Sequence, residues 1–305
     1  FLRKLKPSKM GKRTDDEKDK QGLGVEKLKD ISSLKKICQN VLTEKDDWYE
    51  RIIVRKISIY LSRVFIVIGA SANFVTALSF IAGVIGVVLI GLQLPWIVLC
   101  GCVMLQFWYL LDKCDGEVAR YWKYKINNRV AKSKLESDLS GVFLDYILHY
   151  IIHSLVFASI GFGLYQKYNN IYTLGLCFSA ALSMIFINLI IQCKDSIMLN
   201  KLRILKVNMD FDKNSETETR QLSFMLKMFS FVHYLCTFPF IINIMMICGV
   251  LNLFIFETEK IYFQPFIWFL LFYGIISPMV WISKFLFYVF KRKIDSEFNQ
   301  IAQWN

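Results

Sequence analysis

The chain has 305 residues, of which 55% are hydrophobic and 15% aromatic, and its formal net charge is +12. A soluble domain of this length is rarely so apolar, so the composition favours an integral membrane protein. The basic residues follow the edges of apolar runs instead of forming one cluster, which argues against a nucleic-acid-binding protein.

The N-terminal part divides into two segments. Residues 1–47 are polar and charged, so we expect a cytoplasmic and partly disordered segment, in which the apolar spacing of 25–46 favours a short amphipathic helix. Residues 48–70 mix bulky apolar side chains with arginine and lysine, which predicts an amphipathic helix lying in the lipid headgroup plane. The alternative is a basic flank that only fixes the topology.

Residues 71–290 contain six apolar runs long enough to cross a bilayer, which takes about 20 residues per helix. The runs are 73–92, 95–111, 142–165, 171–193, 229–256 and 262–290. We therefore predict an all-α fold, an integral membrane bundle of six transmembrane helices preceded by the interfacial helix. Residues 291–305 form a tail.

The distribution of basic residues predicts the orientation of the spans. Of the 37 Lys and Arg residues, 17 precede residue 66, seven lie in 113–140, six in 194–223 and three in 291–293. The three connections on the opposite side hold only Lys167 and Lys260. This asymmetry places both termini and the two long loops in the cytoplasm.

The eight cysteines lie mostly inside the predicted spans, and none forms a Cys-x-x-Cys pair. We interpret them as small packing residues, not as disulfides or metal ligands.

An acidic cluster follows the second span. Asp112 and Asp115 are three residues apart, which puts both on one face of a helix. Gly116 and Ala119 lack bulk and would let a ligand approach the backbone, and Arg120 could neutralise phosphate oxygens. A helix-end charge cluster would explain Asp-x-x-Asp on its own.

A polar stripe marks the third span, where Asp145, His149 and His153 follow Gly141 at steps of four. Ionisable groups inside spans are costly, so they usually face the bundle interior and are functional. Three carboxylates in a partly dry pocket need a counter-charge, and oxygen ligands suit Mg²⁺ or Mn²⁺. The residue types thus predict a metal–phosphate site at the cytoplasmic membrane edge. His153 is interpreted as a packing residue.

These residues resemble a known family. DKCDGEVAR (112–120) followed by GVFLD (141–145) is similar to the CDP-alcohol phosphotransferase, or phosphatidyltransferase, pattern D-x2-D-G-x2-A-R-x8-G-x3-D-x3-D. The stretch SANFVTALSF, with Asn73 and Thr76, resembles the family's Pro-Asn-x-x-Thr entry to the first span. The resemblance covers about 48–290.

The resemblance implies a metal-dependent enzyme of phospholipid synthesis, in which a hydroxyl acceptor attacks a CDP-alcohol donor and CMP leaves, one of the two substrates being a lipid. It implies that Asp112, Asp115 and Asp145 hold the divalent metal. The nucleotide would lie against Asn73, Thr76, Gly116, Ala119, Arg120 and Gly141. It also implies a homodimer.

The sequence departs from the family pattern at three points. His149 stands where the pattern has its last aspartate. It would act as general base or as a metal ligand, or the replacement means that activity has been lost. An unperturbed histidine pKa of about 6.5 suits proton abstraction near neutrality. Twenty residues (121–140), not about eight, separate Arg120 from Gly141, and we expect an additional cytoplasmic loop there. Ala72 replaces the entry proline.

Two other classes of function stay open. One is a catalytically inactive member that binds nucleotide and metal in a regulatory role. The other is a small transporter with an acidic ion site, which the position of the acids at the membrane edge disfavours. The sequence does not identify the alcohol. The stretch RIIVRKISIYLSR resembles the in-plane segment of archaeal inositol-phosphate-type members of the family, and this resemblance favours inositol-type substrates.

Overall fold

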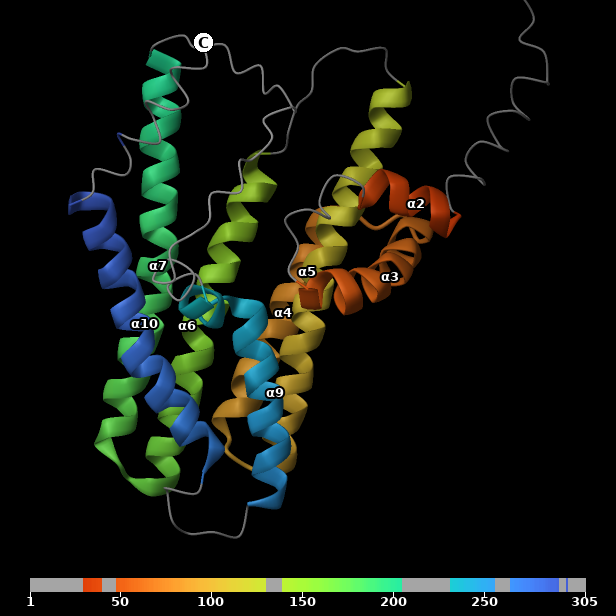
Figure 1. Cartoon of the computed structure of the whole chain (residues 1–305). Coiled ribbons are helices and arrows are strands. Elements are labelled where there is room, and N and C mark those ends of the chain that lie inside the picture. The colour runs from red at the N-terminus through yellow and green to blue at the C-terminus, as the bar shows by residue number, and fades with distance from the viewer. Residues whose placement is uncertain are drawn as a thin grey trace, which may run out of the picture. The chain divides into compact units, whose positions relative to one another are not determined.

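The computed structural model of the chain describes residues 30–39, 48–129, 139–204, 231–255, 264–290 and 295 (Figure 1). All the regular structure in these ranges is helical, which confirms the predicted all-α class. The chain forms two compact units. Unit 1 is Phe1–Val75 with Leu110–Glu136, and unit 2 is Thr76–Tyr109 with Ser137–Asn305.

Five of the described helices are long and apolar enough to cross a membrane. They are α4 (Ala72–Gly91), α5 (Pro95–Arg129), α6 (Leu139–Tyr168), α7 (Ile171–Ile204) and α10 (Pro265–Phe290). Each contains most or all of one predicted span, so the chain has the helices of a multi-pass membrane protein.

The sixth predicted span, 229–256, corresponds to a shorter helix. Helix α9 (Phe238–Phe254) has 17 residues and therefore a length of about 26 Å, less than the hydrocarbon core of about 30 Å. A turn at Cys236 and Thr237 separates it from the helical residues 231–235, and Pro239 occupies its first turn. A sixth span stays a prediction.

Helix α5 extends beyond its predicted end at residue 111. It continues through the acidic cluster to Arg129, so the expected loop over 121–140 is wrong for Tyr121–Arg129. No glycine or proline occurs between Glu117 and Arg129 to stop the helix. The rest of the expected loop, 130–138, lies outside the described residues.

Unit 1 is built on the second half of α5 together with α2 (Ile31–Cys38), the π-helical turn η1 (Glu50–Val54) and α3 (Arg55–Val67). Leu34, Cys38 and Ile59 are 1% exposed or less and form its apolar contacts. Burial raises the pKa of the Cys38 thiol to about 12, so this cysteine is a neutral packing residue. η1 and α3 confirm a helix within 48–70.

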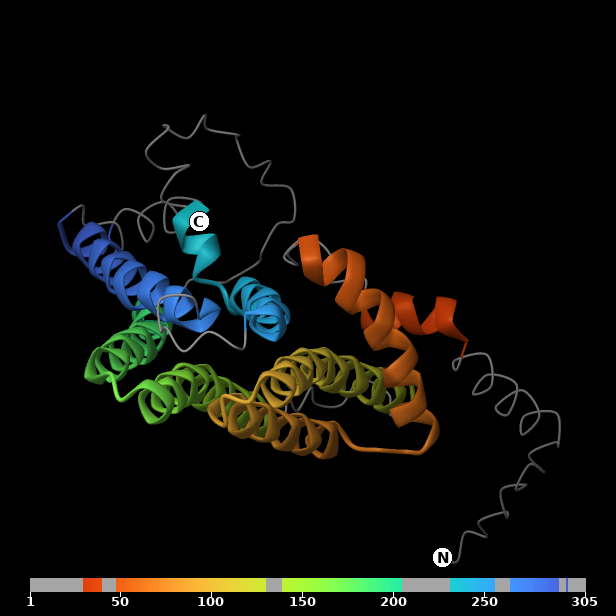
Figure 2. The same ribbon diagram turned by 90° about the horizontal axis from the view of Figure 1, so that it is seen from below.

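Unit 2 contains the close packing of α6, α7 and α10, which lie next to one another in Figure 2. Small residues bring these helices together. A Cβ atom on Gly161 of α6 would lie 2.2 Å from Cβ of Cys177 on α7, and one on Gly274 of α10 would lie 2.9 Å from the Leu176 side chain. Ser179 Oγ donates to the Gly274 carbonyl at 2.8 Å. Such contacts are typical of helix packing in membranes.

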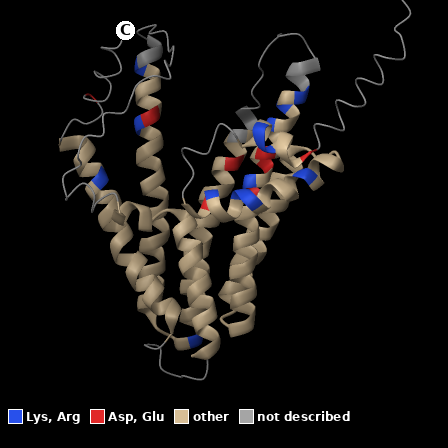
Figure 3. Ribbon diagram, turned by 45° about the vertical axis from the view of Figure 1, so that its right-hand side comes forward, with Lys and Arg blue, Asp and Glu red and all other residues tan. Residues whose placement is uncertain are grey.

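The two units differ in charge. In Figure 3 the ribbons of the unit 2 spans are almost entirely uncharged, whereas lysine, arginine and acidic residues gather on the helices of unit 1. The polar buried side chains of unit 1 include Arg55, Asp115 and Glu117. The acidic cluster predicted from the sequence therefore lies in the charged unit.

The start of α4 is fixed without the proline of the family pattern. Ser71 precedes the helix, and its Oγ accepts a hydrogen bond from the Phe74 N–H at 3.2 Å. This is the geometry of an N-cap, which satisfies a backbone donor that the first turn leaves unpaired. Ala72 in place of proline therefore does not prevent a defined helix start.

Candidate metal centre

Helix α6 carries the Asp145–His149 pair in unit 2. Because the segment is helical, the two residues lie one turn apart on the same face. His149 Nδ1 is 2.9 Å from the Asp145 carbonyl oxygen and 3.2 Å from Asp145 Oδ1. Both partners are acceptors, so the hydrogen bond requires the proton on Nδ1, and the lone pair of a neutral His149 is then on Nε2. That tautomer suits a metal ligand or a base.

Aromatic rings surround this pair. The His149 ring lies 5.3 Å from the Trp108 ring of α5 and 5.7 Å from the His153 ring, measured between centroids. His153 stacks on Phe238 with centroids 3.7 Å apart, which supports its interpretation as a packing residue. The His149 side chain is 24% exposed and Asp145 is 41% exposed, so the protein itself does not close off the pair.

The acids of α5 lie in unit 1. Asp112 is 9% exposed at its side chain, and Lys113 Nζ lies 3.5 Å from Asp112 Oδ2 and 3.0 Å from Glu50 Oε1. Asp115 is also 9% exposed. Asp112 follows Trp108 by four residues on the uninterrupted helix α5, so the two share a helix face.

Within unit 2, the Asp145 carboxylate and the His149 imidazole lie close together and could contribute to one metal site. The sequence motif adds Asp112, and we call Asp112, Asp145 and His149 the predicted metal-binding group. Two carboxylates and one imidazole are suitable ligands for Mn²⁺, while Mg²⁺ prefers oxygen atoms alone. The roles of Asp112 and Asp115 as ligands stay predictions.

Arg120 has a structural partner in unit 1. Its Nε donates to the carbonyl oxygen of Cys38 at 2.6 Å, which satisfies a backbone acceptor at the C-terminal end of α2. The guanidinium group lies over Gly116, where a Cβ atom would be 3.2 Å from Nη1. The small residue at 116 therefore makes room for Arg120 itself. Contact of Arg120 with a nucleotide stays a prediction.

The other residues predicted to bind the nucleotide lie on three helices. Asn73 is exposed and Thr76 is buried in the first turns of α4, Ala119 is exposed on α5, and Gly141 is half-buried near the start of α6. Their contacts with a nucleotide stay predictions.

Glu117 is a buried residue whose role the sequence analysis missed. Its side chain is fully buried, and its carboxylate accepts hydrogen bonds from Ser58 Oγ and Ser62 Oγ of α3, each at 2.7 Å, and from Gln39 Nε2 at 2.8 Å. Arg55 Nη1 lies 3.4 Å from the same carboxylate. Two serines one helical turn apart in an apolar helix were the sequence signal for this partner.

A second polar contact lies in unit 2, between residues far apart in the sequence. Lys284 of α10 is 8% exposed, and its Nζ lies 3.1 Å from His233 Nε2. This contact orients His233.

All eight cysteines are free thiols, six of them buried, as expected for packing residues.

No protein-family profile matches the chain, and no curated protein matches it either.

Proposed function

We propose that the protein is a membrane-embedded, metal-dependent phosphotransferase that moves a phosphoalcohol or phosphatidyl group from a CDP-alcohol to a hydroxyl acceptor, with release of CMP. The contact between Asp145 and His149 on α6 carries this proposal, because it places a metal-ligating carboxylate beside a candidate base. The motif at 112–120 and 141–145 supplies the substrate class by resemblance.

The chemistry needs charge neutralisation and positioning more than covalent help. A divalent cation held by the carboxylates of Asp112 and Asp145 would neutralise pyrophosphate oxygens and ease the departure of CMP. Asp145 would also orient His149 through the Nδ1 hydrogen bond, and Nε2 of His149 would take the proton from the acceptor hydroxyl. If His149 is a ligand instead, another base must serve.

The α3 helix supports a membrane-surface position for unit 1. Its exposed side chains include Ile57, Tyr60 and Val64, which follow one helix face, whereas Ser58 and Ser62 point inward to Glu117. An exposed apolar face flanked by Arg51, Lys56 and Arg63 suits a helix lying at the headgroup level.

The remaining parts of the proposal rest on the amino-acid sequence alone. We propose a sixth span over 229–256, both termini and the site in the cytoplasm, and a homodimer. The asymmetric distribution of lysine and arginine supports the orientation.

The test is CMP release from a panel of CDP-alcohols and acceptors by the purified full chain in detergent, with Mg²⁺ or Mn²⁺. We expect turnover that chelation abolishes and metal restores. Asp112→Asn should lower kcat/KM at least about 100-fold, or about 2.7 kcal/mol of transition-state stabilisation. Asp195→Asn is the matched control, because this carboxylate on α7 is 58% exposed and outside the group.

His149→Ala separates the roles of the histidine. A base predicts loss of kcat with donor binding retained, whereas a ligand predicts weaker metal binding as well. Full activity of Asp112→Asn, or no CMP release from any donor, would contradict the enzyme proposal. Tight binding of CDP-alcohol and Mn²⁺ without turnover across the panel would instead establish the inactive, regulatory alternative.

A further inference from the structure

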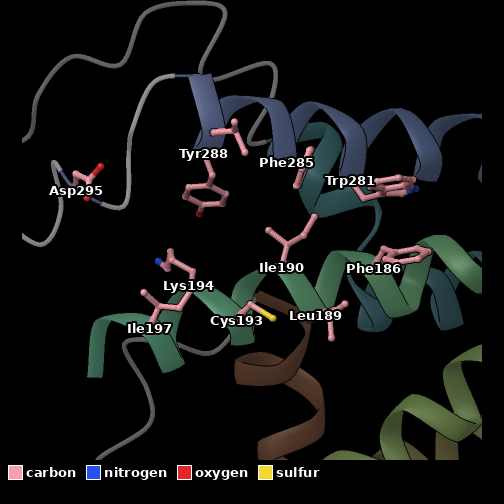
Figure 4. Close-up of a pocket in the computed structure, with 11 residues that line it drawn as sticks. Phe186, Leu189, Ile190, Cys193, Lys194, Ile197, Trp281, Phe285, Tyr288 and Asp295 are labelled. Atoms are coloured by element: carbon pink, nitrogen blue, oxygen red, sulfur yellow. The ribbon is translucent and has the colours of Figure 1, made fainter. Parts of the chain in front are cut away.

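A groove in unit 2 runs between α7 and α10 and uses no residue of the metal-binding group. Its volume is about 550 Å³, within the range of roughly 300–1,000 Å³ that small-molecule pockets have. Figure 4 shows the residues that line it, among them Phe186, Ile190 and Cys193 of α7 and Trp281, Phe285 and Tyr288 of α10.

The two ends of the groove differ in polarity. At one end the Phe186 ring stacks on the Trp281 ring, with centroids 5.0 Å apart and planes inclined by 29°. At the other end Lys194 Nζ lies 5.8 Å from the centroid of the Tyr288 ring. The groove is therefore apolar along its wall and carries an ammonium group where it ends (Figure 4).

The position of Lys194 along α7 matches the depth of a phosphate group in a bilayer. Ile171–Cys193 is an apolar run without Lys, Arg, Asp or Glu. Its 23 residues span about 34 Å as a helix, slightly more than the hydrocarbon core of about 30 Å. Lys194 is the first charged residue after this run, so it stands where lipid headgroups begin.

Further charges border this polar end. Asp195 forms a 3.5 Å ion pair with Lys194 but is 58% exposed, and Asp295 also lines the groove. Exposed ion pairs contribute little, so Asp195 does not prevent Lys194 from contacting a phosphate.

We propose that this groove binds one membrane phospholipid, with an acyl chain along the apolar wall and the phosphodiester at Lys194. The amphipathic lining fits such a molecule in both chemistry and depth. A packed helix of a second copy is a poorer fit, because the Phe186–Trp281 stack closes one end of the groove. The bound lipid would join α7 to α10 on the charged side of the bundle.

Two native cysteines report on occupancy. Cys193 lines the groove, and Cys100 of α5 is exposed but outside it. The experiment measures the alkylation rate of each thiol by N-ethylmaleimide, using mass spectrometry on the full chain in detergent. With added phosphatidylglycerol we expect the Cys193 rate to fall at least fivefold and the Cys100 rate to change less than twofold.

Two partial ligands separate the contribution of the phosphate from that of the acyl chains to the protection of Cys193. Diacylglycerol with the same acyl chains lacks the phosphate, and glycerol phosphate lacks the chains, so each should protect Cys193 less than twofold. Lys194→Gln should remove most of the protection. Lys201→Gln is the matched control, because it lies two helical turns, about 10 Å, further along the same face of α7 and does not line the groove.

Several results would overturn the proposal. Equal protection of Cys193 and Cys100 would mean only a general lipid shell, and equal protection by diacylglycerol or in Lys194→Gln would remove the phosphate contact. A photoactivatable phospholipid should also crosslink to 186–197 and 281–289 in the wild type. Asp112→Asn should leave the protection unchanged, so this proposal can fail or succeed independently of the enzyme proposal.

Discussion

Units 1 and 2 share helix α5 but are stabilised by different interactions. In unit 1 the helices are held by the buried carboxylate of Glu117, whose partners come from α3 and from Gln39 after α2. In unit 2 small residues such as Gly161 allow the helices to approach closely. One chain thus combines a polar interior with an apolar close-packed one.

The difference follows from the surroundings that each unit needs. Helix α3 buries Ser58 and Ser62 beside apolar residues such as Ile59, and its exposed face carries both apolar and basic side chains. Such a mixed outer face suits the boundary between lipid and water. The spans of unit 2 are apolar inside and outside, so burial cannot drive their association, and close contact of backbones replaces it.

The largest expected effect is the loss of Glu117. Glu117→Ala leaves Arg55, which is 10% exposed at its side chain, without its buried ion-pair partner. Removing one member of a buried pair costs about 3–5 kcal/mol. We expect a loss of that size in the free energy of unfolding, measured by SDS titration in mixed micelles, together with faster trypsin cleavage at the basic residues of α3.

Two variants serve as controls for this experiment. Glu117→Gln keeps an oxygen acceptor for the serines and should lose clearly less stability than Glu117→Ala. Asp195→Ala removes an exposed carboxylate and should change stability by less than about 0.5 kcal/mol. Equal stability of Glu117→Ala and the wild type would mean that the carboxylate does not hold α3 to α5.

The next effect tests the close packing of unit 2. Gly161→Ala places a Cβ atom 2.2 Å from Cβ of Cys177 and 3.0 Å from the Thr173 carbonyl oxygen, so α6 and α7 must separate. Overpacking of this kind costs about 1–3 kcal/mol. The same SDS titration measures it.

Gly175→Ala on α7 is the matched control, because no atom lies within 4 Å of the new Cβ. It should be neutral or stabilise the helix by up to about 1 kcal/mol. Cys177→Gly in the Gly161→Ala background should recover part of the loss. If Gly161→Ala and Gly175→Ala behave alike, the close contact of α6 with α7 is not a source of stability.

The sequence was sufficient for features that depend on composition and local spacing. Runs of about 20 apolar residues predicted five of the helices, because crossing a bilayer requires that length. The four-residue step from Asp145 to His149 predicted that they share one helix face, because a helix repeats every 3.6 residues, and the two side chains are in contact. Asp112 was assigned as a ligand from the motif.

Features that depend on distant partners could not be predicted in this way. The burial of Glu117 depends on which face of α3 meets α5, 55 or more residues away in the sequence. The contact of Lys284 with His233 joins residues 51 apart. The continuation of α5 to Arg129 was not predicted, because hydropathy marks where the apolar residues end, and a helix can continue into polar sequence.

The smallest effect concerns a polar contact between spans. Gln106 of α5 donates through Nε2 to Asn243 Oδ1 of α9 at 3.0 Å and lies 3.3 Å from the Ile242 carbonyl. Side-chain hydrogen bonds between membrane helices average only about 0.6 kcal/mol in double-mutant cycles, because the separated helices find other partners. A cycle of Gln106→Leu and Asn243→Leu should therefore give a coupling of about 0.6 kcal/mol, far below the effect of Glu117→Ala. A coupling above about 2 kcal/mol would mean that unit 2 also depends on buried polar contacts, and the contrast with unit 1 would be lost.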